Sequence, residues 1–139
     1  YKGAGPALTD LMGGQIDAMF DGMGSSAGHI KGGRIKAIAV ASDKRAPGFP
    51  NIPTAAEQGL NYKVSTWYGL WAPRGTPPDV IAKMQAELKK AYNSDELKTI
   101  WNGSGAEVPD LYGEAFGKFV TSEIKRWGDV ARASGAKLD

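Results

Sequence analysis

The sequence predicts an α/β fold in which helices cover a parallel sheet. Two apolar runs rich in β-forming residues, at 16–20 and 35–41, alternate with short Gly-bounded segments of helical character, at 6–12 and 25–31. This βα order is typical of a parallel sheet with helices packed on it. Beyond residue 77 the pattern becomes helical, so the second half of the chain is expected to be mainly α-helix.

The middle of the chain is predicted to be loop followed by extended structure. Residues 44–53 hold three prolines and a glycine, which indicates a loop. Thr54 follows, with Glu57 three residues later, and this is the spacing of a capping box at the start of a short helix. Residues 62–71 then predict a long extended segment.

Three helices are predicted after Pro77-Pro78. In the first, Asp79 lies in the first turn, where the helix dipole favours an acid, and apolar side chains recur at three- to four-residue steps: Val80, Ile81, Met84, Leu88 and Tyr92. The second, at 94–101, takes Ser94 as its N-cap and stops near Gly103 and Gly105.

A short edge strand is expected at Val108 before the last helix, at 111–133. One face of that helix is apolar: Phe116, Phe119, Val120, Ile124 (or Glu123), Trp127, Val130 and Ala131.

Composition excludes several classes of protein. The formal charge of +2 comes from mixed acidic and basic residues without a basic block, so nothing indicates a nucleic-acid partner. The absence of cysteine excludes disulfide bonds, thiol nucleophiles and Cys-ligated metals. No apolar stretch approaches the length that spans a bilayer, and we identify no signal peptide. The chain begins at Tyr1 without Met, which fits a processed or truncated product.

The loop Gly3-Ala4-Gly5 is the first candidate binding site. Its glycines let backbone N–H groups approach a ligand, and Pro6 presets the first turn of the following helix, whose N-terminus suits an anion such as a carboxylate. A dinucleotide fingerprint is excluded because Leu8 stands where the third glycine belongs, and no Gly-Lys-Ser/Thr follows for a phosphate loop. The alternative is a tight turn without a ligand.

The second candidate is the stretch Asp21-Gly22-Met23-Gly24-Ser25. It directly follows a predicted strand, the place where open α/β sheets bind ligands. The alternative is that Asp21 orders the loop through hydrogen bonds to its own backbone and touches no ligand.

Ser26 lies in the pattern Gly-x-Ser-x-Gly at 24–28, which is typical of the nucleophile elbow of hydrolases. A nucleophile elbow places its serine directly after a strand, but five residues separate Phe20 from Ser26. The chain's one histidine, His29, is only three residues on and has no third group to orient it. We therefore interpret Ser25 or Ser26 as a helix cap, and a lone histidine does not make a metal site.

The chain resembles the tripartite tricarboxylate transporter receptors, also called the Bug family of extracytoplasmic solute receptors. The resemblance runs in order along nearly the whole chain, through YKGAGPA (1–7), GQIDAMFD (14–21), HIKGG (29–33), IAVAS (38–42) with Lys44-Arg45, IPTAAE (52–57), WYGLWAPRGTP (67–77), EIKRW (123–127) and SGAKLD (134–139). It implies the C-terminal half of a type II periplasmic-binding-protein-like fold. Residues 1–66 are then a βα segment of the second lobe that lines the ligand cleft. Residues 67–139 are the crossover strand and the C-terminal helices of the first lobe.

The resemblance also implies a function without catalysis or cofactor. A periplasmic receptor of this kind closes its lobes on a small carboxylated solute and delivers it to membrane permease subunits. The ligand-binding residues it implies are Gly3, Ala4, Gly5, Asp21, Gly22, Met23 and Ser25. Gly22 departs from the family pattern, in which an Asn usually follows the Asp, so the ligand preference is expected to differ if that amide touches ligand in relatives.

Two alternatives to a receptor stay open. One is an esterase that uses Ser26. The other is a truncated fragment that binds nothing and self-associates through its exposed sheet edges and apolar faces.

Overall fold

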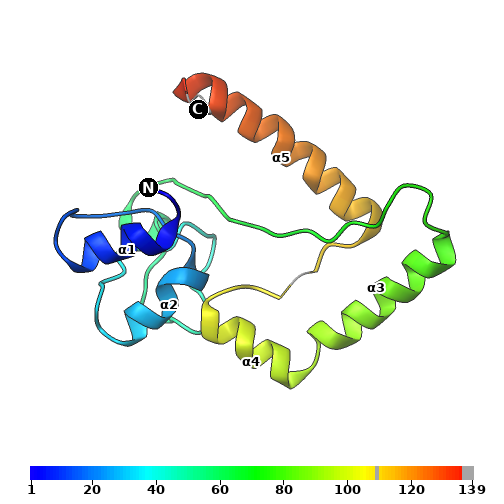
Figure 1. Ribbon diagram of the computed structural model, residues 1–139, viewed down its shortest axis with the longest axis horizontal. Coiled ribbons are helices and arrows are strands. Elements are labelled where there is room, and N and C mark those ends of the chain that lie inside the picture. Colours follow the sequence, from blue (N-terminus) through cyan, green and yellow to red (C-terminus); the bar gives the residue numbers. More distant parts are fainter. Residues whose placement is uncertain (109, 136–139) are drawn as a thin grey trace. The chain divides into compact units, whose positions relative to one another are not determined.

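The computed structural model describes residues 1–108 and 110–135. The chain divides into two compact units, Tyr1–Val108 and the remainder, and each is described here by itself (Figure 1). This division concerns packing within the chain. The lobe boundary expected after residue 66 concerns the longer relatives and stays a prediction.

Two short helices open the first unit, and they pack against each other (Figure 1). They are α1 (Ala4–Met12) and α2 (Met23–Lys31), and each begins two residues before the helix expected from sequence. Pro6 is accommodated because it lies in the first turn of α1, where its missing N–H has no intrahelical partner to lose. The predictions of both helices are confirmed.

The strands expected at 16–20, 35–41 and 108 are not formed as strands. Among the described residues the only β pairing outside helices is an isolated parallel bridge between Val40 and Thr54, with Val40 N–H donating to the Pro53 carbonyl at 2.9 Å. A strand exists only through hydrogen bonds to a neighbour, and an isolated pairing is marginal in water. The parallel sense of the one bridge agrees with the expected sheet, but the ladders themselves are missing.

The buried core of the unit lies between α2 and the loop that follows Val40. Its buried members are Ala27, Val40, Ala46, Phe49 and Ile52, and Met23, Ile30 and Ala37 pack against them. The helical spacing of Met23, Ala27 and Ile30 gives α2 one inward face.

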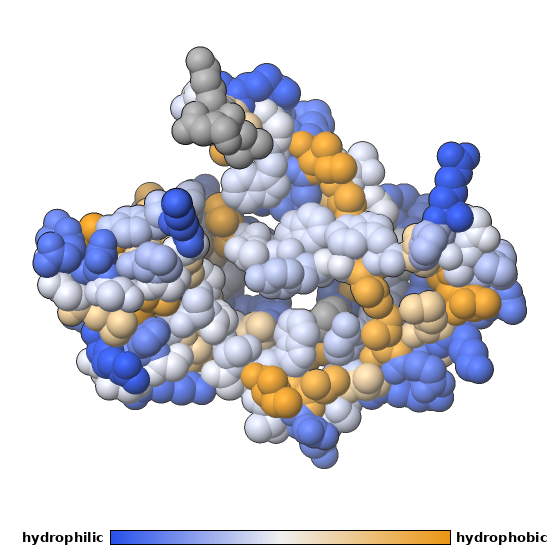
Figure 2. All heavy atoms as spheres, viewed as in Figure 1, coloured by the Kyte–Doolittle hydropathy of each residue, from blue (hydrophilic) through white to orange (hydrophobic). Residues whose placement is uncertain are grey.

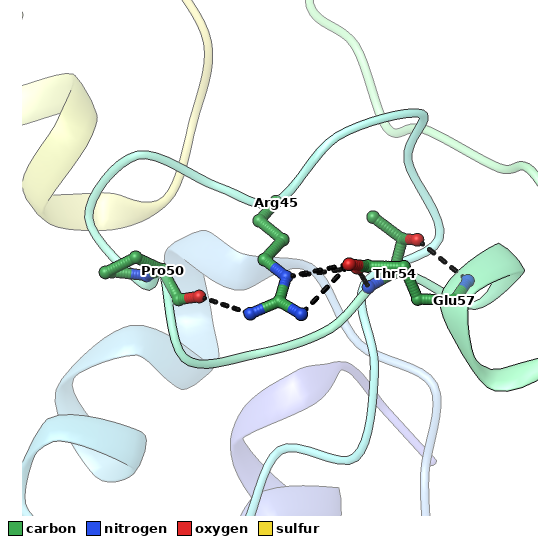
Figure 3. Close-up of polar contacts among 4 residues, drawn as sticks. All are labelled: Arg45, Pro50, Thr54 and Glu57. Atoms are coloured by element: carbon green, nitrogen blue, oxygen red, sulfur yellow. Dashed lines mark hydrogen bonds and ion pairs between the residues drawn. The ribbon is translucent and has the colours of Figure 1, made fainter.

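The loop 41–53 is closed at its base by an ionic clamp (Figure 3). The Arg45 guanidinium donates to both carboxylate oxygens of Glu57 at 2.9–3.1 Å and to the Pro50 carbonyl at 2.8 Å. Glu57 also completes the predicted capping box, since it accepts from Thr54 N–H at 2.7 Å while Thr54 Oγ1 accepts from Glu57 N–H at 3.1 Å. The helix that begins here is a single 3-10 turn, η1 (Ala56–Gln58), which contains Glu57 and has Ala55 as its N-cap.

Two further helices complete the first unit, α3 (Pro78–Tyr92) and α4 (Asp95–Ser104). Ser94 caps α4 as predicted, with its Oγ accepting from Leu97 N–H at 3.3 Å. Gly105 ends α4 in the left-handed conformation, at φ 74°. α4 packs on both α2 and α3.

Two contacts join α4 to the earlier part of the chain. Lys31 Nζ donates to the Gly103 carbonyl at 2.6 Å and lies 5.0 Å from the centre of the Phe49 ring. At Gly48 the loop approaches α4 so closely that a Cβ there would lie 3.0 Å from the carbonyl carbon of Asn102 and nearer still to its oxygen. The loop and α4 therefore meet backbone to backbone.

In the second unit, the described residues 110–135 form the helix α5 (Gly113–Ser134), where a helix over 111–133 was expected. The sequence left open whether Ile124 or Glu123 lies on the apolar face of this helix. Glu123 is the buried one, at 7% exposure, while Ile124 is 70% exposed. The Glu123 carboxylate accepts from Trp127 Nε1 at 3.1 Å and from Arg126 at 3.3 Å. Trp127 thus lies beside a carboxylate within the helix.

Several large hydrophobic side chains remain at the surface. Figure 2 shows hydrophobic surface over α3 and α4, where Val80, Met84 and Ile100 are 42–57% exposed. Phe20, in the expected but unformed strand, is 89% exposed. No helix in the described ranges is long and apolar enough to cross a membrane.

Candidate ligand-binding site

A depression of about 450 Å³ adjoins the N-terminus of α1. Three of the residues predicted to bind ligand line it, namely Gly3, Ala4 and Asp21. The rest of its wall is formed by Tyr1, Ala7, Ile16, Ala18, Met19 and Phe20. The structure thus brings the first predicted loop and the start of the second to one place.

The N-terminus of α1 offers hydrogen-bond donors to this depression. Gly3 is its N-cap, and no side chain caps the helix there. Its φ of 101° belongs to a region that glycine adopts readily and other residues avoid. Because the first N–H groups of a helix have no intrahelical acceptor, those of Ala4 and Gly5 can donate to water or to an anion.

Asp21 holds the first turn of α2. Its Oδ2 accepts hydrogen bonds from the hydroxyls of both Ser25, at 2.6 Å, and Ser26. Burial by itself raises the pKa of Asp21, but the bonds from Ser25, Ser26 and the Gly22 N–H outweigh it, so the pKa lies below its ordinary value. Asp21 is therefore ionised at neutral pH.

The interpretation of Ser25 or Ser26 as a helix cap is wrong. The N-cap is Gly22, which makes no side-chain cap, and both serines lie inside the first turn. Both hydroxyls donate to Asp21, which lies outside the helix.

The remaining predicted ligand residues do not line the depression. Gly5 lies in the first turn of α1 and Gly22 caps α2. Met23 packs on the core, and its side chain lies where a Cβ at Gly105 would fall. The Ser25 hydroxyl is already bonded to Asp21 and to the Gly22 carbonyl, at 2.9 Å. A ligand contact at any of these four stays a prediction.

Ser26 and His29 do not form a nucleophile and base. Ser26 is 8% exposed and its hydroxyl donates to Asp21. In the described structure the buried Nδ1 of His29 has no hydrogen-bond partner. A nucleophile needs its base within hydrogen-bond reach, so the geometry does not favour acyl transfer. Across residues 1–108 and 110–135 no group of three or more His, Cys, Asp or Glu could hold a metal ion.

Sequence reasoning missed most of the wall of the depression. Ile16, Met19 and Phe20 were assigned only to a strand, yet with Ala7 and Ala18 they supply its apolar lining. A signal was available, because this apolar run leads directly into Asp21, and residues that end beside a binding loop often line the same site.

Solved structures of solute-binding proteins resemble this chain in fold. MatC from Rhodopseudomonas palustris, solved with bound malate, is 37% identical, with a TM-score of 0.78 over 94% of this chain and 46% of that one. A second R. palustris protein, solved with adipate, is 32% identical, with a TM-score of 0.84 over 97% of this chain and 46% of that one. The fold is thus that of part of a periplasmic solute-binding protein, although residues 1–108 and 110–135 show only the one bridge in place of strands.

Sequence comparison gives the family. The family model described as "Tripartite tricarboxylate transporter family receptor" matches residues 1–136, and the chain belongs to this family. Protein BugT of Bordetella pertussis is 35% identical over 139 residues, which are 99% of this chain and 43% of BugT. The chain therefore spans about half the length of these relatives. The recognition made from the motifs is confirmed, as is the partial α/β binding-protein fold.

Proposed function

We propose that this chain forms one side of a receptor site for a small carboxylated solute. The solute carboxylate accepts hydrogen bonds from the N–H groups at the start of α1, and its carbon chain lies against the apolar wall of the depression. The observation that carries the proposal is the side-chain-free N-cap Gly3 at the edge of that depression. The malate and adipate in the two R. palustris structures support the choice of a carboxylate.

The available contacts set the expected affinity. Hydrogen bonds to a charged group contribute about 1.5–3 kcal/mol each. The Ala4 N–H at the depression and the Gly5 N–H next along the helix therefore supply at most roughly 3–6 kcal/mol, from which the entropy cost of association is lost. A dissociation constant near 1 mM corresponds to about 4.1 kcal/mol. Since the chain spans about half of its relatives, we expect binding near the millimolar range for this chain alone.

Membership of the family leads us to propose how the lobes are arranged, where the receptor acts and what it delivers its solute to. Residues 1–66 belong to the second lobe and residues 67–139 return to the first, with closure about the extended segment 62–71. The receptor acts in the periplasm, delivers its solute to the permease subunits of a tripartite transporter, and catalyses no reaction.

The test is a thermal melt with malate, adipate and citrate, and with neutral succinamide as the control ligand. A ligand at ten times its dissociation constant stabilises the native state by about 1.4 kcal/mol. Filling the depression with Ala4→Leu should abolish the shift without unfolding the helix, because Ala and Leu are both strong helix formers. Ala82→Leu makes the same change near the start of α3, away from the depression, and should leave the shift intact.

The outcomes separate the readings. A rise in melting temperature with a carboxylate that Ala4→Leu removes and Ala82→Leu keeps supports the receptor site. No shift with any carboxylate at tens of millimolar overturns it for this chain. Hydrolysis of a p-nitrophenyl ester that is lost in Ser26→Ala would instead revive the esterase alternative.

A further inference from the structure

The charge on the wall of the depression is concentrated at one side chain. Of the residues that line it, Asp21 is the one with a charged side chain, and the others are apolar or glycine except Tyr1. The Tyr1 hydroxyl donates to Asp10 at 2.8 Å. No lysine or arginine side chain lines the depression in the described structure.

Asp21 retains capacity to accept further hydrogen bonds. A carboxylate has about four lone-pair sites on two oxygens. Both serine hydroxyls bond the same oxygen, Oδ2, and the Gly22 N–H takes one further site, so acceptor capacity remains. Those bonds also fix the rotamer, so the carboxylate is held in place before a ligand arrives. Asp21 remains exposed to solvent.

We propose that Asp21 is a specificity-determining residue that accepts a hydrogen bond from a hydroxyl or ammonium group of the bound solute. The inference rests on the proposed function, in which the solute carboxylate lies at the start of α1. Carboxylates that carry a donor substituent then bind more tightly than the same carbon chain without one. An ammonium group gains most, because it also meets the negative charge of Asp21.

The experiment measures dissociation constants for succinate, malate and aspartate by calorimetry at neutral pH. These three share one four-carbon backbone and differ at C2 by hydrogen, hydroxyl or ammonium. The protein carries an acetylated N-terminus, which removes the charge of the Tyr1 amino group from the same wall. We expect aspartate to bind about tenfold more tightly than succinate, with malate between them; tenfold corresponds to about 1.4 kcal/mol.

Asp21→Asn tests the residue itself. The amide oxygen still accepts from the serine hydroxyls, but the charge is gone, so the ratio of aspartate to succinate affinity should fall toward one. Asp17→Asn removes an exposed carboxylate from the same segment, outside the depression, and should leave the ratio unchanged.

Each result bears on a different claim. If none of the three acids binds, the proposed function fails. If they bind but succinate equals or exceeds aspartate, or Asp21→Asn leaves the ratio unchanged, the receptor site stands and the role of Asp21 is overturned. The wild-type ratios decide this even where circular dichroism shows that Asp21→Asn does not fold.

Discussion

Gly48→Ala should destabilise the first unit because there is no room for a Cβ. The added carbon would lie 3.0 Å from the carbonyl carbon of Asn102, whereas carbon atoms in contact prefer about 3.5–4.0 Å. The loop or α4 must then move by at least roughly 0.5–1 Å, since the Asn102 oxygen would lie nearer still, and the obstacle is backbone, which cannot rotate away. Overpacking of this kind costs about 1–3 kcal/mol.

The assay is a thermal melt followed by circular dichroism. For a unit of this size a loss of about 1–3 kcal/mol lowers the melting temperature by roughly 4–15 °C. Gly28→Ala is the matched control, since it lies inside α2 with nothing within 4 Å of its Cβ position. It should stabilise by about 0.5–1 kcal/mol, because alanine favours helix. Equal melting temperatures for Gly48→Ala and wild type would refute the close approach of the loop and α4.

Three further predictions concern the clamp, the α4 cap and the exposed phenylalanine. The hydrogen bonds from the Arg45 guanidinium, and to a smaller extent from the Thr54 N–H and hydroxyl, hold the pKa of Glu57 at about 2. Because this pKa is depressed, the stabilisation is complete above pH about 4.5 and disappears as the pH falls toward 2, so the melting temperatures of wild type and Glu57→Gln should converge over that interval. Glu107→Gln, at the exposed and longer pair with Lys44 (3.7 Å), should differ little from wild type throughout. Ser94→Ala should lower stability by about 1 kcal/mol and Ser94→Gly by only a few tenths, measured by urea unfolding, and equal losses would contradict the cap. The self-association expected from the sequence stays a prediction, and Phe20, at 89% exposure, should drive it. Light scattering at high protein concentration should show a mass above the 14.7 kDa of one chain, and Phe20→Ser should lower that mass. A monomer at every concentration would contradict self-association.

Features coded by neighbouring residues were predictable from the sequence. The capping box of Thr54 and Glu57 and the cap at Ser94 depend on residues three positions apart, and both formed as expected. The strands failed for the opposite reason. Apolar runs at 16–20 and 35–41 carry β propensity, but a ladder depends on partner segments that the pattern within a run does not specify.

The candidate site was predictable in part for the same reason. Gly3 and Asp21 were found because a glycine turn before a helix and an acid after an apolar run are local patterns. The depression between them was not, since it depends on how α1 packs beside residues 16–20. The Arg45 clamp escaped as well, because its two ends lie 12 residues apart with no periodic signal.

The Arg45–Glu57 clamp holds the loop 41–53, and the bond from Lys31 to Gly103 holds α4. The two contacts close chain segments of different length, and this difference bears on the order of folding. The Arg45 clamp closes 12 residues, whereas the Lys31 bond to Gly103 closes 72. Since closure entropy grows with the logarithm of loop length, the longer closure costs about 1.6 kcal/mol more. The clamped loop is therefore expected to form early and α4 to dock late, so the amide protons of α4 should exchange with solvent before those of the segment around Val40.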